Sequence, residues 1–208
     1  MLCAMNRKLM IVALMAMLFV GVQSADAQVR KWEAEIGVGG ISPTNKLEFD
    51  KNTLGWNVLV EARRNLNMLP LDLGLRVDGN VFKREYKSLE DLKNTQFKSF
   101  NAMAVADLNL FRKSKIQVFV GCGLGYGWLA NQVYEIGKAD GTLDTVDKVK
   151  DAWNSKSALV AMPRVGVELF HHLRATLYYK VPADKVLVKE QGHFGLSLGV
   201  VLGGGLIE

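Results

Sequence analysis

Hydrophobic and polar residues alternate along much of this chain, most regularly over residues 116–130, IQVFVGCGLGYGWLA. Glycine takes every second position from Gly121 to Gly127, and apolar residues lie between the glycines. Residues 116–134 carry no charge and are long enough to cross a bilayer as a helix. However, each glycine disfavours a helix by roughly 1 kcal/mol relative to alanine, and a period of two is the strand signal. We therefore interpret this segment as a β-strand.

Seven further segments alternate in the same way, which predicts eight strands in all. The eight segments cover residues 32–39, 56–63, 71–82, 100–110, 116–130, 157–169, 173–180 and 194–202. Their lengths are close to the ~9–11 residues that a tilted strand needs to cross a bilayer. Pro163 lies inside the sixth segment. Because proline has no amide hydrogen to donate to a ladder, we expect a bulge there or a later start to that strand.

The connections between the segments alternate in length. Those after the even-numbered segments are short, at residues 65–70, 112–115 and 171–172. Those after the odd-numbered segments are longer and more polar, at residues 41–53, 83–96, 130–155 and 182–192. Short turns at one rim and long loops at the other are typical of an outer-membrane barrel, whose turns lie in the periplasm. This difference in loop length between the two ends is less expected for a soluble β-sandwich or a lipocalin.

In a closed barrel, one parity of each strand faces the lumen and the other faces lipid. The inward parity holds seven acidic and five basic residues: Glu33, Glu35, Glu61, Arg63, Asp72, Arg76, Asp78, Asp107, Arg164, Glu168, Arg174 and Lys180. The outward parity holds seven aromatic residues: Trp32, Trp56, Phe100, Tyr126, Trp128, Tyr179 and Phe194. All of these aromatics except Trp32 lie toward the loop rim. The interior of an eight-stranded barrel is just wide enough for side chains to fill, so we expect paired charges to plug the lumen and glycines to make room for them.

Residues 1–27 have the features of a secretory signal peptide. Arg7 and Lys8 precede an apolar stretch over residues 9–22, and Ala25-Asp26-Ala27 forms an A-x-A cleavage site. The sequence therefore predicts a single mature domain over residues 28–208, exported from the cytoplasm.

The patterning, the loop asymmetry and the signal peptide together resemble the small outer-membrane β-barrel domain family, the eight-stranded OmpA/OmpX-like barrels of Gram-negative bacteria. The resemblance spans residues 31–204. It implies an all-β fold, an eight-stranded antiparallel up-and-down transmembrane β-barrel in the lipid bilayer of the cell outer membrane. It further implies a monomer with a structural or adhesive role, whose loops 41–53, 83–96 and 130–155 meet an extracellular ligand or another envelope protein.

Signals for catalysis are weak, so the leading interpretation is not an enzyme. His171 and His172 lie in the shortest turn, and His193 opens the last segment. Ser197 is four residues further on, roughly 13 Å away at the rise of a strand, too far for a serine–histidine pair. The alternatives are an outer-membrane lipid-modifying enzyme of the lipid A deacylase or acyltransferase type, centred on His193, and a PorT-like accessory barrel of a secretion system.

Metal, cofactor and nucleic-acid sites are not predicted either. The longest loop contains Asp140, Asp144, Asp147 and Asp151 without the pattern of a calcium loop. Its residues 145–153 have the apolar spacing of a short helix, and Ser88-x-x-Asp91 resembles a helix N-cap. The formal charge is +5, or +4 without the signal peptide, and basic residues form no stripe, so we expect no nucleic-acid partner. Cys122, the one cysteine of the mature chain, sits at an apolar position and is read as a small hydrophobe.

Overall fold

Eight long β-strands make up most of the protein. The structure is a computed structural model that describes residues 28–29, 31–44, 50–52, 54–66, 69–87, 92–111, 114–137, 143–145, 154–184, 192–203 and 206–207. The long strands are β2 (Trp32–Pro43), β4 (Gly55–Leu66), β5 (Leu71–Lys87), β6 (Leu92–Leu110), β7 (Ile116–Gly137), β9 (Asn154–Leu169), β10 (Leu173–Pro182) and β11 (His193–Leu202). No helix among these described residues is long and apolar enough to cross a membrane.

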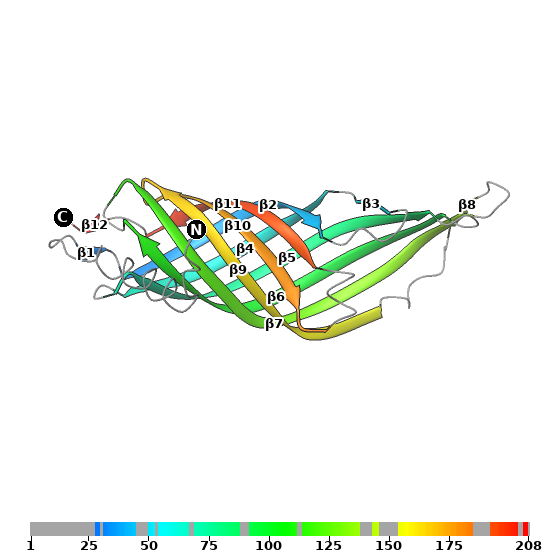
Figure 1. Cartoon of the computed structure of the whole chain (residues 1–208), viewed down its shortest axis with the longest axis horizontal. Helices are drawn as coiled ribbons and strands as arrows, with labels where there is room; N and C mark the ends of the chain where they lie inside the picture. Colours follow the sequence, from blue (N-terminus) through cyan, green and yellow to red (C-terminus); the bar gives the residue numbers. More distant parts are fainter. Residues whose placement is uncertain are drawn as a thin grey trace, which may run out of the picture.

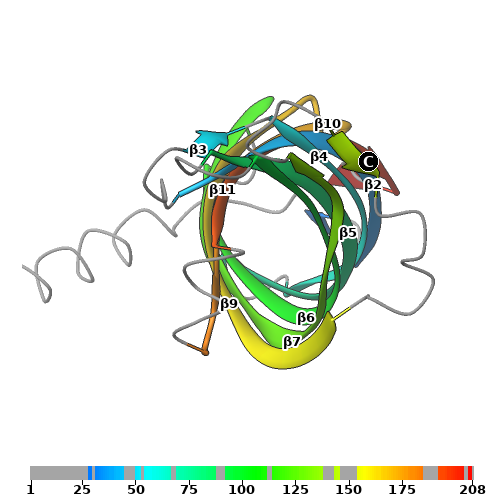
Figure 2. The same ribbon diagram turned by 90° about the vertical axis from the view of Figure 1, so that its right-hand side faces the viewer.

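The eight strands close into a barrel. Each long strand pairs antiparallel with the next one in the chain, and β11 pairs antiparallel with β2, so the ladder returns to its starting strand. Figure 2, which looks along the long axis, shows the resulting ring. Closure satisfies the backbone polar groups without leaving an edge, as a strand in lipid requires. The predicted all-β, eight-stranded up-and-down barrel is therefore confirmed.

Four short strands extend the two ends of the barrel. At one end, β1 (Gln28–Val29) pairs with β12 (Leu206–Ile207). At the other end, β3 (Asp50–Asn52) pairs with the last part of β5, and β8 (Leu143–Thr145) pairs with the last part of β7. Figure 1 shows β1 and β12 on the left and β3 and β8 on the right.

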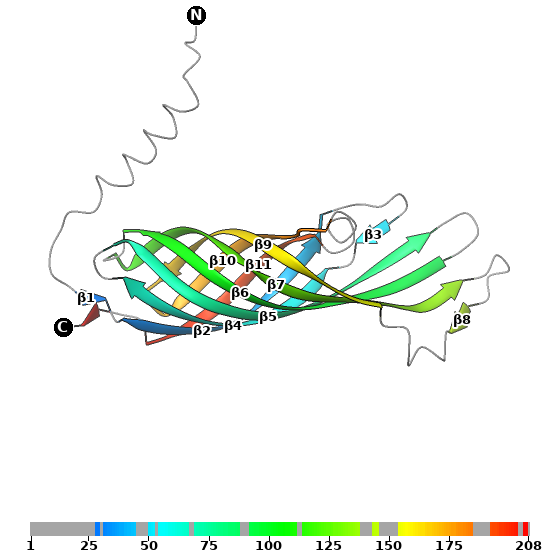
Figure 3. The same ribbon diagram turned by 90° about the horizontal axis from the view of Figure 1, so that it is seen from below.

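The strands at the loop end are longer than the alternation predicted. Most of the loop expected over residues 83–96 is strand, because β5 continues to Lys87 and β6 begins at Leu92. The expected loops 41–53 and 130–155 likewise contain the ends of β2 and β7, the start of β9, and all of β3 and β8. Figure 3 shows β5, β6 and β7 projecting past the other long strands. The predicted strands ended too early because a ladder is held by backbone hydrogen bonds. These bonds continue beyond the last position at which apolar side chains face lipid.

Pro163 is accommodated without the expected bulge. On one side β9 keeps a continuous register with β7, in which Pro163 pairs with Cys122. On the other side the pairs with β10 stop at Tyr178–Arg164 and resume at Val181–Ala161 in the same register. The missing amide hydrogen of proline thus interrupts the ladder to β10 locally, and the surrounding pairs hold the register.

The short turns of the opposite rim contain strained backbone. Phe170 and His171 both have positive φ, 54° and 59°, and Phe111 has a φ of 60°. The amide of His172 donates to the carbonyl of Leu169 at 3.0 Å and closes the turn between β9 and β10. Two consecutive left-handed residues suit the twist of a tight hairpin, although bulky residues rarely adopt that conformation.

Several sequence predictions lie outside the described residues. These are the signal peptide at residues 1–27, the cap at Ser88-x-x-Asp91 and most of the helix expected over residues 145–153. Thr145 itself ends strand β8.

We expect Pro163→Val to raise the free energy of unfolding by about 1 kcal/mol, because valine restores one ladder donor toward β10. Urea unfolding of the protein in lipid vesicles, followed by tryptophan fluorescence, would measure the change. Ala161→Val, at an exposed position two residues earlier on β9, is the matched control and should leave the midpoint almost unchanged. An equal or lower midpoint for Pro163→Val would contradict the local gap in the ladder.

Candidate functional site

Polar residues line much of the barrel's interior, and apolar residues cover most of its outside. Strand β11 shows this clearly, because its residues alternate strictly between buried and exposed from His193 to Leu202. Ser197 is fully buried, whereas the neighbouring Leu198 is 63% exposed. This is the reverse of a water-soluble protein and is the arrangement of a barrel whose outer solvent is lipid.

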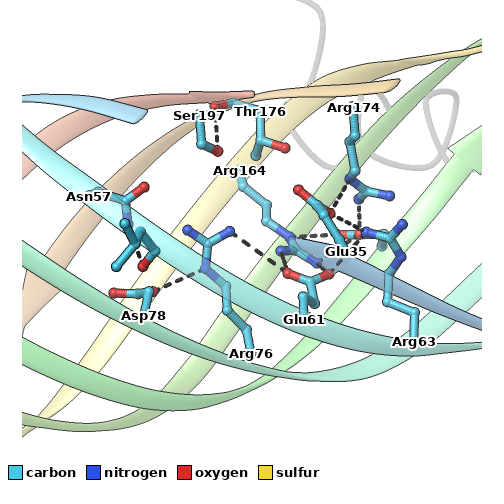
Figure 4. A network of polar contacts seen from close by, with 12 residues as sticks. Glu35, Asn57, Glu61, Arg63, Arg76, Asp78, Arg164, Arg174, Thr176 and Ser197 are labelled. Carbon is cyan, nitrogen blue, oxygen red and sulfur yellow. Dashed lines mark hydrogen bonds and ion pairs between the residues drawn. The ribbon is translucent and has the colours of Figure 1, made fainter. Parts of the chain in front are cut away.

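The structure places all twelve charged residues assigned to the lumen inside the barrel, where none is more than 6% exposed. Figure 4 shows part of the network that they form. Its members come from β2, β4, β5, β6, β9 and β10, so the contacts cross the lumen as well as run along its wall. Charges this deeply buried are tolerated only when they are paired and hydrogen-bonded.

Arg164 on β9 connects two opposite walls of the barrel. Its Nη1 and Nη2 donate to the two carboxylate oxygens of Glu61 at 2.6 and 2.9 Å. Its Nε and Nη2 donate to the two oxygens of Asp107 on β6, each at 2.7 Å. One planar guanidinium therefore holds two carboxylates in bidentate geometry, which is the strongest form of this interaction.

Arg63 and Arg174 extend the network toward the turn rim. Arg63 contacts Glu35 at 2.7 Å, Glu61 at 3.2 Å and Glu33 at 3.3 Å. Arg174 pairs with Asp107 and, at 3.2 Å, with Glu168. The guanidinium carbon of Arg174 also lies 3.6 Å from the ring centre of Phe119, so that an aromatic face covers part of the cation.

A second cluster surrounds Asp78 nearer the loop rim. Lys180 forms an ion pair with Asp78, and Arg76 Nε donates to Asp78 Oδ2 at 3.0 Å. Arg76 Nη1 also lies 3.7 Å from Glu61 Oε2, so this residue joins the two clusters. Both cations lie over the ring of Tyr178, at 5.2 Å for Arg76 and 5.4 Å for Lys180. The ion pairs thus connect the charges around Glu61 with those around Asp78.

Buried asparagines compensate for the excess of acids over bases. Asn65 donates to Glu33 at 2.8 Å, Asn101 donates to Asp78 at 2.9 Å, and Asn109 donates to Asp72. Asn80 donates to both Asp78 and Ser99 at 2.9 Å. Sequence reasoning concentrated on charges and missed these amides as network members. Their inward parity was the signal that could have identified them.

Above the charges, apolar side chains fill the lumen toward the loop rim. The rings of Phe82 and Phe97 stack with centroids 5.1 Å apart. Ile41, Val160, Met162 and Tyr178 belong to the same buried cluster. The ring of His193 lies beside Phe82 and Tyr178, with centroid distances of 6.1 and 6.2 Å.

Glycines make room for the long interior side chains. A Cβ on Gly121 would lie 2.0 Å from Asp107 Oδ1, and one on Gly199 would lie 2.4 Å from Glu35 Oε1. At Gly195 a Cβ would lie 2.1 Å from the ring of Tyr178. The glycine parity of β7 and β11 therefore follows from crowding inside the barrel.

The outer surface carries the aromatic residues assigned to lipid. Trp32, Trp56, Phe100, Tyr126, Trp128 and Phe194 are between 42% and 64% exposed, and Tyr179 is half-buried. Phe100 packs against Trp128 at 5.7 Å, and Tyr179 packs against Phe194 at 4.6 Å. The turn rim has more aromatics than Trp32 alone, because Phe111 and Phe170 are 74% and 59% exposed there. These two residues lie just outside the predicted strands and turns and were not among the aromatics predicted to face lipid.

The height of the apolar surface matches a bilayer. On β7 the outward positions are Ile116, Val118, Val120, Cys122, Leu124, Tyr126 and Trp128. Trp128 lies 12 residues after Ile116, which is roughly 40 Å along a strand and roughly 28 Å along the axis of a barrel whose strands tilt by about 45°. Charged side chains flank this band: Arg64 lies over Trp32 at the turn rim, and Lys98 is exposed at the loop rim.

The candidate catalytic residues are not assembled into a catalytic site. His193 and Ser197 are both buried in the lumen, and Ser197 Oγ lies 3.5 Å from the carbonyl of Thr176, to which it donates. His171 lies at the turn rim, where its Nδ1 is 2.6 Å from Gln117 Nε2. Within the described ranges, no group of three His, Cys, Asp or Glu side chains could hold a metal ion.

Comparison with known proteins identifies the fold. No protein-family model matches the sequence, and no curated protein matches it. The structure is similar to Neisserial surface protein A, with 16% identity and a TM-score of 0.54, over 84% of this chain and 98% of that one. It also matches Ail of Yersinia pestis in complex with the heparin analogue sucrose octasulfate, with 17% identity, a TM-score of 0.42, and coverage of 83% and 99%. The N-terminal β-barrel domain of Pseudomonas aeruginosa OprF matches with 12% identity, a TM-score of 0.45, and coverage of 84% and 100%. At such identities the likeness concerns the fold, which is that of a small outer-membrane β-barrel.

We expect Arg164→Ala to lower the free energy of unfolding by about 3–5 kcal/mol, because it leaves two buried carboxylates without their shared cation. Arg76→Ala should act in the same direction. Urea unfolding in lipid vesicles would measure both. Arg64→Ala is the matched control, since it removes an outward-facing arginine from β4.

A triple variant, Arg164→Ala with Glu61→Gln and Asp107→Asn, should recover part of the lost stability because it removes the stranded charges. Equal midpoints for Arg164→Ala and Arg64→Ala would show that the network does not stabilise the barrel.

Proposed function

We propose that this protein is an outer-membrane barrel with a structural and adhesive role, which presents its loop-end strands to an extracellular ligand or envelope protein and does not conduct. The observation that carries the proposal is the inverted polarity of the barrel. Its outside is apolar over the height of a bilayer, and its inside is filled by paired charges. A chain built in this way gains its stability in a membrane, with rigid strands that support whatever projects from it.

The side chains that occupy the lumen support the proposal that it is closed to ions. Arg164, Glu61 and Asp107 join opposite walls in the middle of the barrel, and Phe82 and Phe97 stack nearer the loop rim. A continuous path for ions would have to separate both layers. Eight strands enclose an interior that side chains fill, whereas porins use 16–18 strands to leave an aqueous channel.

The adhesive role is supported by the shape of the loop end. Strands β5, β6 and β7 remain paired as far as Lys87, Leu92 and Gly137, and β3 and β8 widen this sheet. Paired strands hold a binding surface more rigidly than separate loops do, which lowers the conformational entropy lost when a ligand binds. The predicted signal peptide at residues 1–27 and the name of Neisserial surface protein A are consistent with surface exposure.

The lipid-modifying enzyme receives no support from the geometry. Its central residue, His193, is 3% exposed and lies among aromatic rings inside the barrel. A lipid ester at the membrane surface would need a nucleophile and a base on the outside of the barrel. The secretion-system accessory barrel shares the proposed fold and differs from the leading proposal in its partner.

We expect purified protein in a planar lipid bilayer to show no stable unitary conductance, because the charge network and the aromatic layer both block the lumen. A 16-stranded porin in the same bilayers provides the positive control for insertion. Insertion of this protein is checked separately by the protection of its strands from protease in vesicles. Stable current steps from correctly inserted protein would overturn the closed lumen.

We expect the loop end to face outward from intact cells. The test uses a chain with Cys122→Ser and one new cysteine, either Asp140→Cys beyond strand β7 or Lys113→Cys in the turn before it. A membrane-impermeant maleimide should label the first variant on intact cells and both variants after lysis. Labelling of the turn variant alone on intact cells would mean the opposite orientation and would refute the presenting role.

A further inference from the structure

A groove on the outer face of the barrel lies where the apolar band meets the loop rim. Its volume is about 320 Å³, at the lower end of the range for ligand sites. It spans four strands, because Val58, Gly79, Phe100 and Trp128 are consecutive partners across β4, β5, β6 and β7. Trp56 and Lys98 belong to the adjacent row nearer the rim.

The floor of the groove is Gly79, whose missing side chain makes the hollow. A Cβ there would lie 3.8 Å from Val58 Cγ2 and 4.0 Å from the carbonyl of Ser99, which are ordinary contacts. The inward glycines are different, since a Cβ on Gly121 would overlap Asp107. The fold therefore does not need glycine at position 79, and the large neighbours Trp56, Phe100 and Trp128 leave a depression around it.

The groove combines apolar walls with a cation at one end. Trp56, Phe100 and Trp128 are each about half exposed, at 56%, 50% and 49%. Lys98 is exposed at the end nearer the loop rim, and Lys83 is exposed one row beyond it, on the neighbouring strand β5. An acyl chain in the groove would thus place its head group beside ammonium groups at the interface.

We propose that this groove binds one acyl chain of a phosphorylated glycolipid of the lipid A type from the outer leaflet, with Lys98 pairing a head-group phosphate. The assignment to the outer leaflet rests on the proposed function, which directs the loop rim outward. Bulk phospholipid covers the whole apolar band, but a lipid A head group carries two phosphates where a phospholipid carries one, so Lys98 and Lys83 above the hollow at Gly79 favour the glycolipid at this place.

Competition between lipids tests the proposal, with Trp56 and Trp128 as reporters. The protein carries Trp32→Phe and Trp153→Phe and is reconstituted in bilayers of brominated phosphatidylcholine, which quenches tryptophan. Unbrominated lipid A or phosphatidylglycerol is then titrated in. Selective binding of lipid A should relieve the quenching beyond its mole fraction, whereas phosphatidylglycerol should relieve it in proportion.

Three variants separate the groove from the general surface. Gly79→Val fills the floor and should abolish the preference for lipid A, while Lys98→Gln should reduce it about fivefold, the effect of one cation near a phosphate. Gly40→Val is the matched control, because Gly40 is the partner of Trp56 on its other side and has room for a Cβ. This variant should keep the full preference.

Proportional relief by lipid A in the parent protein, or an unchanged preference in Gly79→Val, would overturn the site. Equal relief by phosphatidylglycerol would overturn the assignment to a glycolipid. The measurement uses reconstituted bilayers and does not depend on conductance or on orientation in cells. Its failure would therefore leave the proposed function standing, and a failure of the proposed function would leave this measurement interpretable.

Discussion

In a closed antiparallel barrel every side chain points either into the lumen or out to the surroundings, and the pleat assigns these two directions alternately. Once the ladder from β2 to β11 is closed, all other features of this protein depend on that constraint. Charges cannot leave the inward positions without entering lipid, and apolar side chains cannot leave the outward ones without displacing the network. In β11, for example, buried and exposed residues alternate strictly along the strand.

Inside the barrel, the constraint makes stability a property of several strands at once. Arg164 on β9 holds Glu61 on β4 and Asp107 on β6, and Arg76 joins this group to the cluster around Asp78. Space for these side chains comes from glycines on the same walls. These contacts therefore hold β4, β5, β6 and β9 together from inside the barrel, in addition to the backbone ladder. Strands held together in this way form a rigid support for the residues at the ends of the barrel and on its outer face.

Outside the barrel, lipid acts as a second solvent that the surface has to match. Aromatic residues border the apolar band at both rims, with Phe111 and Phe170 at the turns and Trp56 and Trp128 near the loops. Such rings favour the level of the lipid head groups. Beyond the band, β5, β6 and β7 stay paired, so the same ladder that spans the membrane also builds the part that projects from it.

Alternation along the chain was enough to predict eight strands and the side to which their residues point, because a period of two is a local property that each strand displays by itself. The closed barrel was predicted from the sorting of short turns and long loops. The inward positions of Glu61 and Arg164 could be predicted in this way, but their pairing could not. Partners across a lumen come from strands about 100 residues apart, and alternation carries no information on which side chains meet. The same reason applies to the length of β5 and β6, which backbone pairing extends beyond the lipid-facing residues, and to the register that carries Pro163 through β9. It also applies to the hollow at Gly79, which exists only because four strands bring Val58, Phe100 and Trp128 around it.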